Sequence, residues 1–349
     1  MALPLVVGVD GSQSSLNAVD WAVDAASRHR VPLRLVHGSL WERYEGIRPV
    51  TDPEHPWDRV MADQITGTAA DRARRRGPDV KISTEVFPED PVSLLLRAGE
   101  EAYGVVTGAR GRGELSGLLL GSVALTVAAR ASCPVTVVRG GLPNRRGSFG
   151  RVVLGVDEPA DRAAPALRYA FSEAEAGGRE LTAVRSWRCP AGKVTDDLMI
   201  YGDPVRAHWA RAERVLDDAL RVPERDHPKV VVNRETVEGP ARKALLHAAA
   251  TADLLVLGAR RRHGHLAGLQ LGRVVHTALH HAPCPVAVVP ERDEDPARME
   301  RKRRAHPGRG TSGGPVPGTR PDGCEPDTLR GREVHARRTD PGDQRARRR

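Results

Sequence analysis

The residues with the clearest capacity for chemistry lie in one glycine-rich stretch, GARGRGELSGLLLGS, which runs from Gly108 to Ser122. A short aliphatic run before it predicts a buried strand, and the residues after it predict a helix whose first turn Ser122 is placed to cap. Glycines let backbone approach an anion closely, and the N–H groups that begin a helix attract negative charge. Arg110 and Arg112 add positive charge. The stretch therefore predicts a phosphate-binding loop.

Two common phosphate motifs do not fit this stretch. A Walker A loop needs Lys before its final Ser or Thr, whereas Gly121 precedes Ser122. A dinucleotide fingerprint follows the first strand of its domain, whereas this loop follows the fourth predicted strand. The spacing that does fit is G-x2-G-x9-G-[ST], at Gly108, Gly111, Gly121 and Ser122. The plain alternative is a glycine-rich strand-to-helix connection without a ligand.

This spacing resembles the ATP-binding signature of the universal stress protein family. The resemblance covers both halves of the chain, roughly residues 3–290. It implies an α/β fold of open five-stranded parallel sheets, Rossmann-like and of the adenine nucleotide alpha hydrolase-like type. It also implies ATP as the ligand, with AMP or ADP as alternatives, and Mg²⁺ could accompany the nucleotide. In such sheets a ligand lies across the carboxyl ends of the strands.

The resemblance also implies which residues of the first half contact the nucleotide. Asp10 falls on the acidic residue that contacts the nucleoside, and Val36 and His37 fall where the second strand lines the adenine pocket. The phosphate and ribose loop would comprise Gly108, Arg110, Gly111, Gly121, Ser122 and Val123. A carboxylate accepts hydrogen bonds from ribose or adenine, while backbone N–H and hydroxyl groups donate to phosphate. The alternative for Asp10 is a cap on the first helix.

Strand and helix signals that alternate along the chain supply the elements that would position these residues. In the first 140 residues, the predicted strands are 5–9, 32–37, 80–87, 103–108 and 134–138. A helix is predicted over 57–76, another opens at Asp90-Pro91, and 38–56 is expected to be a loop. Five strands separated by helices predict right-handed crossovers and a parallel sheet.

The same pattern then starts again, about 150 residues further along the chain. The segment VVLGVD that ends at Asp157 repeats VVGVD, and CPVAVV from Cys284 repeats CPVTVV from Cys133. We therefore predict domains over 1–140 and 150–291, with a linker over 141–149. The matching aliphatic last strands predict that the two domains pack as a pseudo-dimer, and a homo-oligomer is a further possibility.

The loop of the second half departs from the motif. It has one extra residue, Arg262 stands in place of Gly111, and Arg273 stands in place of Ser122. A weaker second site is expected, at Asp157, Gly258, Arg260, Gly272 and Arg273. The added arginines could hold phosphate in another way, or they could fill the site.

Composition and charge limit the possible classes of protein. Of the net charge of +9, the segment 292–349 carries +6, and its Gly/Pro-rich composition predicts a disordered basic tail. The tail has no aromatic residues to stack on bases, so nucleic acid is not the expected partner. No apolar run reaches the roughly 18 residues of a membrane span. No signal peptide is evident, and the four cysteines are widely spaced, so a cytoplasmic location is expected.

No constellation of catalytic residues stands out in the sequence. His276, His280 and Cys284 have spacing that could suit a metal, but histidines at a helix end are expected on dipole grounds alone. We therefore predict a nucleotide-binding regulator of stress response or dormancy without dedicated catalytic residues and without a metal site. Two alternatives stay open: an adenylating or slowly ATP-hydrolysing enzyme on this fold, and a nucleic-acid-associated protein that acts through its tail.

Overall fold

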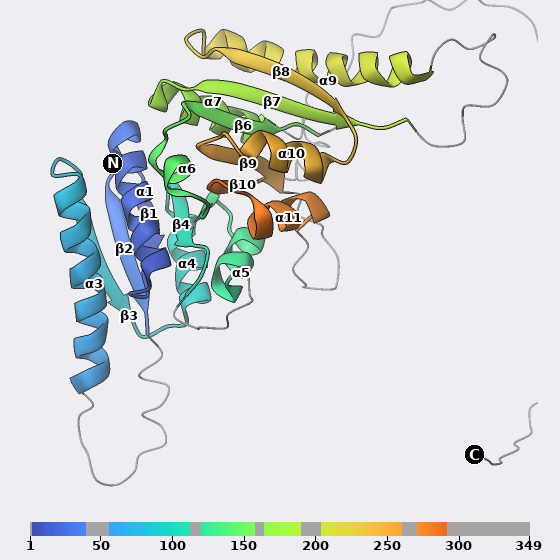
Figure 1. Cartoon of the computed structure of the whole chain (residues 1–349). Coiled ribbons are helices and arrows are strands. Elements are labelled where there is room, and N and C mark those ends of the chain that lie inside the picture. Colours follow the sequence, from blue (N-terminus) through green and yellow to red (C-terminus); the bar gives the residue numbers. More distant parts are fainter. Residues whose placement is uncertain are drawn as a thin grey trace, which may run out of the picture. The chain divides into compact units, whose positions relative to one another are not determined.

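The computed structural model describes residues 2–39, 56–111, 120–157, 164–189, 204–259 and 271–291. In this part of the chain, two βα repeats share a ten-stranded sheet with the strand order β3-β2-β1-β4-β5-β10-β9-β6-β7-β8 (Figure 1). Neighbouring strands are parallel except at the centre, where β5 and β10 pair antiparallel. The predicted fold class, two parallel-sheet α/β domains in tandem, is confirmed.

The first repeat alternates strands and helices from the start of the chain. Its elements are β1 (Leu5–Gly8), α1 (Gln13–His29), β2 (Leu33–Gly38), α3 (Pro56–Arg76), β3 (Ile82–Phe87), α4 (Pro91–Glu100), β4 (Gly104–Gly108), α5 (Ser122–Arg130) and β5 (Val135–Val138). Each of the five predicted strands is therefore present, as are the helices predicted at 57–76 and after Asp90. Most of the predicted loop over 38–56 lies outside the described residues.

The second repeat has the same order of elements. They are β6 (Arg151–Gly155), α7 (Ala164–Gly177), β7 (Glu180–Trp187), α9 (Pro204–Asp226), β8 (Val232–Glu238), α10 (Ala241–Ala249), β9 (Leu254–Ala259), α11 (Arg273–His281) and β10 (Val286–Pro290). The tail over 292–349, for which disorder is predicted, lies outside the described residues.

Local capping explains where two helices of the first repeat begin. Ser12 caps α1, because its side chain accepts a hydrogen bond from the N–H of Ser15. Asp90 caps α4 in the same way, through the N–H groups of Val92 and Ser93, and Pro91 takes the first helical position, where no N–H is needed. These caps fix where the strand-to-helix turns end, and therefore where the loops meet the sheet.

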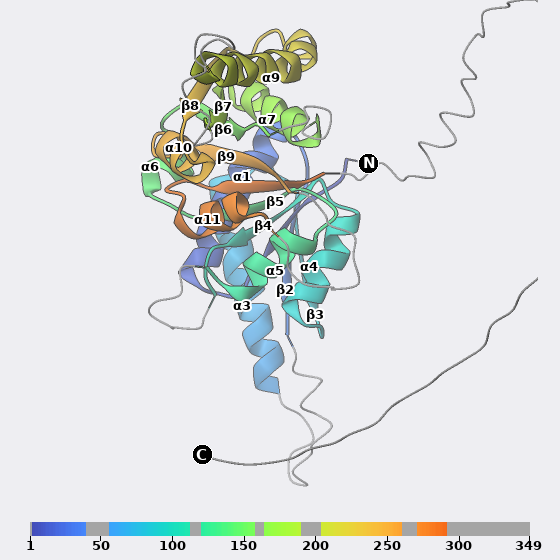
Figure 2. The ribbon, with the colours of Figure 1, turned by 90° about the vertical axis from the view of Figure 1, so that its right-hand side faces the viewer.

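The sheet is covered on both faces. Helices α1, α3, α7 and α9 contribute to one hydrophobic core, and α4, α5, α10 and α11 contribute to the other (Figure 2). The central strands are short and aliphatic because both of their faces are buried. A ligand-binding site can therefore form where the carboxyl ends of the strands meet the starts of the covering helices.

The last strands join the two repeats, as the pseudo-dimer prediction requires. Val135 pairs with Val288 and Val137 pairs with Val286. Nε of Arg139 donates to the carbonyl oxygen of Ala282 at 2.7 Å, at the end of α11. Each domain thus covers an edge strand that would otherwise be exposed.

The predicted linker is more ordered than its turn-forming composition suggests. It contains a short helix, α6 (Leu142–Arg146), which ends at Gly147 with a φ of 74°. Asn144 is buried, and its Nδ2 donates to the carbonyl oxygens of Ala250 and Ala252 at 3.2 and 2.8 Å. The Asn144 side chain thus bonds the C-terminal end of α10 and anchors the connecting segment to the second repeat.

Candidate functional site

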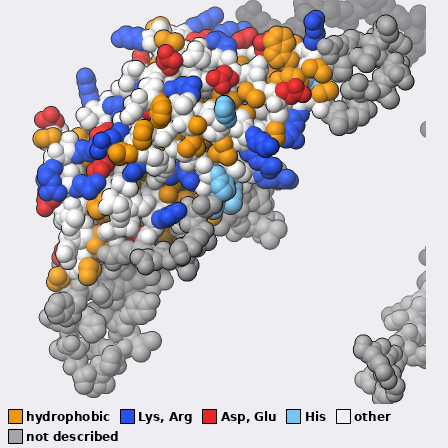
Figure 3. Space-filling view, viewed as in Figure 1, with side chains coloured by type: hydrophobic (Ala, Val, Ile, Leu, Met, Phe, Trp, Pro, Cys, Tyr) orange, Lys and Arg blue, Asp and Glu red, His pale blue; other side chains and the backbone are white. Residues whose placement is uncertain are grey.

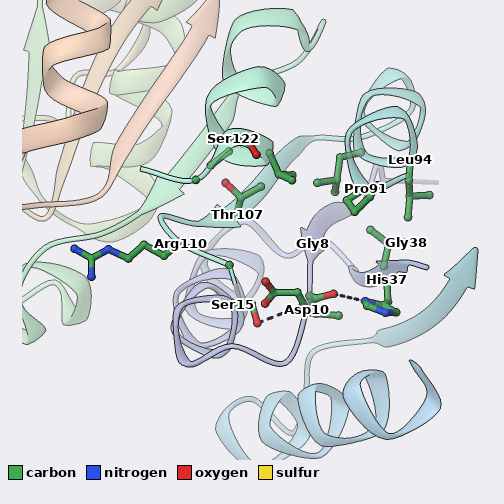
Figure 4. A pocket seen from close by; sticks show the side chains of 18 of the residues that line it. Gly8, Asp10, Ser15, His37, Gly38, Pro91, Leu94, Thr107, Arg110 and Ser122 are labelled. Atoms are coloured by element: carbon green, nitrogen blue, oxygen red, sulfur yellow. Dashed lines mark hydrogen bonds between the residues drawn. The ribbon is translucent and has the colours of Figure 1, made fainter. Parts of the chain in front are cut away.

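A cavity of about 330 Å³ opens at the carboxyl edge of the first repeat (Figure 4). Strand β1 lies between β2 and β4, so the loops that follow β1 and β4 are neighbours at this topological switch point. The structure places all nine predicted residues of the first half around this cavity, namely Asp10, Val36, His37, Gly108, Arg110, Gly111, Gly121, Ser122 and Val123.

Asp10 lies at the end of β1 with one carboxylate oxygen already in use. Its Oδ1 accepts hydrogen bonds from the backbone N–H and the hydroxyl of Ser12, at 3.0 and 2.6 Å. Its Oδ2 faces the glycine loop, 2.9 Å from the position that a Cβ would take at Gly111. Because Ser12 is the helix cap, the alternative of Asp10 as the cap is wrong. The turn holds the carboxylate at the cavity, with Oδ2 directed at the loop.

His37 closes the neighbouring wall of the cavity. Its Nδ1 lies 2.7 Å from the carbonyl oxygen of Val9, which can only accept, so Nδ1 carries the proton of this bond. In the neutral ring, Nε2 is then an acceptor. Val36 is buried beside it, at 1% exposure. Val36 thus offers an apolar surface, and the His37 ring offers a nitrogen that can accept a hydrogen bond from an exocyclic amino group.

The glycine loop is held by α1. A Cβ at Gly108 would meet the backbone carbon of Ser14 at 2.6 Å, so glycine is required by close packing. The N–H of Arg110 donates to the Ser14 hydroxyl at 3.1 Å, which leaves that amide unavailable to a ligand. The Arg110 side chain extends away from Asp10 and His37 (Figure 4). Residues 112–119 of the predicted loop lie outside the described residues.

The start of α5 differs from our expectation for Ser122. The N-cap is Gly121, which has no side chain to bond the helix, and Ser122 is the first helical residue. Ser122 as the cap was therefore wrong. Because no side-chain cap satisfies the first turn, the N–H groups of Ser122, Val123 and Ala124 remain as donors directed away from the helix. All three residues line the cavity.

Several lining residues were not predicted, because they come from α4 or from within a strand. Pro91, Leu94 and Leu95 supply an apolar wall opposite β1. Thr107 is 4% exposed, and among the described residues its hydroxyl has no hydrogen-bond partner. A threonine directly before Gly108 in an otherwise aliphatic strand was the one signal that could have indicated this hydroxyl.

The five residues of the predicted second site do not gather in the same way. Asp157 makes an ion pair with Arg185 at 3.2 Å. Gly258 lies under the carboxylate of Glu291, whose Oε1 is 2.9 Å from the position of a Cβ on Gly258. Gly272 is the N-cap of α11 without a side-chain cap, which matches Gly121. Arg260 lies outside the described residues.

Arg273 lines a separate cavity of about 420 Å³ at the end of β7. Arg188 and Arg242 line it as well, whereas neither Asp157 nor Gly258 does. Because α5 and α11 both begin after a glycine cap, the expected loss of a capping hydroxyl at Arg273 does not distinguish the two repeats. What does distinguish them is the charge near each site.

The histidines of α11 lie together without forming a metal site among the described residues. The rings of His276 and His280 stack with their centroids 4.4 Å apart. Burial and the nearby charges of His276, His281 and Arg139 lower the pKa of His280 below its ordinary value.

None of the helices in the described part of the chain combines the length and hydropathy that crossing a bilayer requires.

The two βα repeats of one ten-stranded sheet, with a cavity at the switch point of the first repeat, define a tandem protein of α/β domains. The family model that describes the universal stress protein family matches residues 1–139 and 148–290. The chain belongs to the universal stress protein family and carries two of its domains.

Relatives with the same arrangement occur in mycobacteria. The chain is 34% identical over 299 residues to a universal stress protein of Mycobacterium tuberculosis, covering 81% of this chain and 96% of that protein. A second universal stress protein of the same organism is 31% identical over 319 residues, covering 84% and 97%. Among solved structures, a universal stress protein from Archaeoglobus fulgidus superposes with a TM-score of 0.61 and 20% identity, over 82% of this chain and 98% of that chain. That structure supports the fold.

Proposed function

We propose that the first repeat binds an adenine nucleotide, ATP or its products ADP and AMP, in the cavity between β1, β2 and β4. The observation that carries the proposal is the convergence of three kinds of group on one cavity. A carboxylate oxygen of Asp10, a ring nitrogen of His37 and the uncapped first turn of α5 all border it. These are the groups that a nucleotide needs.

The cavity suggests how the nucleotide would lie. The apolar side chains of Val36, Leu94 and Leu95 would pack against the base, with His37 at its edge. Oδ2 of Asp10 would accept from the ribose hydroxyls. The phosphates would accept hydrogen bonds from the N–H groups at the start of α5, where the helix dipole favours negative charge.

The same residues argue for binding without dedicated catalysis. Among the described residues that line the cavity, Asp10 is the one acidic side chain, and its Oδ1 is engaged by Ser12. Mg²⁺, if it accompanies ATP, would therefore be held mainly by the phosphates rather than by a set of carboxylates. A general base paired with a nucleophile is not present among these lining residues. We therefore propose a nucleotide-responsive regulator of stress response or dormancy in the cytoplasm.

The proposal extends to the domain organisation. We propose domain boundaries at 1–140 and 150–291, with 141–149 as the connection that contains α6. From its composition, the basic segment 292–349 is proposed to be a disordered tail that belongs to neither domain. Strands β5 and β10 already pair the two repeats within one chain, so a homo-oligomer would need another surface, and a measurement of mass in solution tests for it.

Mass spectrometry of the small molecules released from the purified chain tests the identity of the ligand directly. Calorimetry with ATP, ADP and AMP then measures affinity for the wild type and for Asp10→Ala. Loss of hydrogen bonds to a charged acceptor costs about 1.5–3 kcal/mol, so we expect affinity to fall about 10- to 150-fold.

Asp20→Ala is the matched control, because Asp20 lies in α1, the helix that follows Asp10, but pairs with Arg72 and does not line the cavity. We expect its nucleotide affinity to equal that of the wild type. Equal affinity for Asp10→Ala and the wild type would show that the nucleotide binds elsewhere.

A further inference from the structure

The register of the sheet identifies the equivalent positions in the two repeats. In the first repeat Gly8 pairs with Val36, and His37 follows Val36 at the end of β2. In the second repeat Gly155 pairs with Val184, and Arg185 follows Val184 in β7. Arg185 is therefore the structural counterpart of His37, although neither residue belongs to the glycine-rich loop motif of its repeat.

The two side chains use the same anchor. His37 donates from Nδ1 to the carbonyl oxygen of Val9, at 2.7 Å. Arg185 donates from Nη1 to the carbonyl oxygen of Val156, at 3.2 Å. Val9 and Val156 each precede the acidic residue that follows the first strand of their repeat. The guanidinium thus occupies the place of the imidazole.

Arg185 reaches further than the histidine does. Its Nη1 also lies 3.2 Å from Oδ1 of Asp157, the counterpart of Asp10. In the first repeat the corresponding oxygen binds Ser12, but a glutamate follows Asp157 in place of the Gly-Ser turn. On Asp157, Arg185 therefore takes the place that Ser12 takes on Asp10, and it puts a positive charge at the carboxylate that would serve a ribose. The Arg185 side chain is 16% exposed and that of Asp157 is 75% exposed, so water screens much of this ion pair.

Two further differences between the repeats also disfavour nucleotide binding in the second repeat. Leu257 takes the place of Thr107, and its Cδ2 lies 2.7 Å from the position of a Cβ on Gly155, so it packs against β6 where the first repeat has a hydroxyl. The carboxylate of Glu291 lies against Gly258, the counterpart of Gly108. A carboxylate at that point repels phosphate.

We propose that Arg185 is a built-in occupant of the second nucleoside pocket. Its guanidinium bonds the carbonyl oxygen of Val156, as His37 bonds that of Val9, and it also bonds the carboxylate of Asp157, the counterpart of Asp10. The chain consequently binds one nucleotide, in the first repeat. This inference rests on the proposed function of the first repeat and assigns to the second repeat a pocket closed by its own side chain.

A reciprocal exchange of the two residues tests the proposal in the full chain. His37→Arg places the guanidinium beside Asp10, and we expect nucleotide affinity to fall at least tenfold. Arg185→His combined with Leu257→Thr removes the occupant, and we expect the number of ATP molecules bound per chain at saturation to rise from one to two. His37→Asn is the control for the first exchange, because it shortens the side chain and adds no charge, and its affinity should fall less than that of His37→Arg.

The outcomes separate this inference from the proposed function. A wild-type chain that binds no adenine nucleotide refutes the proposed function and this inference with it. A wild-type chain that binds one nucleotide, together with undiminished affinity in His37→Arg, refutes the role of the guanidinium alone. Two equivalents in the wild type, or one in a folded Arg185→His/Leu257→Thr variant, also overturns the inference. Circular dichroism of each variant establishes that it is folded.

Discussion

Glu173 offers the sharpest test of how the two repeats hold together. It lies in α7 of the second repeat, its side chain is 1% exposed, and its Oε1 accepts from Nε2 of His29 in α1 at 2.9 Å. Arg28 approaches the other oxygen at 4.0 Å, and the Tyr103 hydroxyl lies 3.1 Å from Nδ1 of His29. The carboxylate therefore bonds a helix of the first repeat from within the second.

Replacing Glu173 by alanine would leave Nε2 of His29 without its acceptor and would remove the carboxylate that lies 4.0 Å from Arg28. Removing one partner of a buried charged pair costs about 3–5 kcal/mol. We therefore expect Glu173→Ala to lower the free energy of unfolding by about 3 kcal/mol or more in urea denaturation followed by circular dichroism. Glu173→Gln keeps an acceptor for Nε2 of His29 and should lose less.

Asp24→Ala provides the comparison. Asp24 pairs with Arg76 at 2.6 Å, and both side chains are 31% exposed, so this pair should contribute at most about 1 kcal/mol. A loss in Glu173→Ala no larger than that of Asp24→Ala would refute the reasoning that burial makes the contact between the repeats strong.

The pH dependence of stability follows from the same carboxylate. Burial by itself raises the pKa of Glu173, but the hydrogen bond from His29 and the charges of His29, Arg28 and Arg179 outweigh it and hold the pKa below its ordinary value. A folded pKa below the unfolded one gives stability that is present above the unfolded pKa and is lost as pH falls through the folded pKa. The difference in unfolding free energy between wild type and Glu173→Gln should therefore shrink as the pH is lowered below about 4.

Two further substitutions test the local geometry. Gly108→Ala should destabilise the fold by about 1–3 kcal/mol, because its Cβ would lie 2.6 Å from backbone of Ser14. Gly121→Val should leave thermal stability nearly unchanged, because its φ of −74° is ordinary and the nearest atom to a Cβ is 3.6 Å away, yet it should weaken nucleotide binding by filling the cavity. An equal loss of stability in Gly108→Ala and Gly121→Val would refute these two expectations. Arg30→Gly should raise the free energy of unfolding by about 1 kcal/mol, because Arg30 ends α1 at a φ of 54°, and an unchanged urea midpoint would contradict this.

The sequence alone predicted the architecture and indicated the residues that gather at the first cavity, because short-range patterns determine both. Aliphatic runs of strand length, separated by helical periodicity and repeated once, allow little besides two parallel α/β domains. Glycine spacing marked the loop from Gly108 to Ser122, and the family resemblance that this spacing carries indicated Asp10 and His37. The one local error, Ser122 as a cap, arose because glycine caps this helix through its backbone and leaves no side-chain signal.

Other features were decided only by tertiary structure, because they join residues that no local pattern connects. Thr107 and the Leu94–Leu95 wall became part of the first site when α4 packed over β1 and β4. Arg185 became the counterpart of His37 through the register of β6 with β7. Glu173 and His29, 144 residues apart, met because β5 and β10 pair antiparallel and bring α1 beside α7. Sequence patterns determine which face of each element is buried, whereas the partner of a buried polar group depends on how whole elements pack.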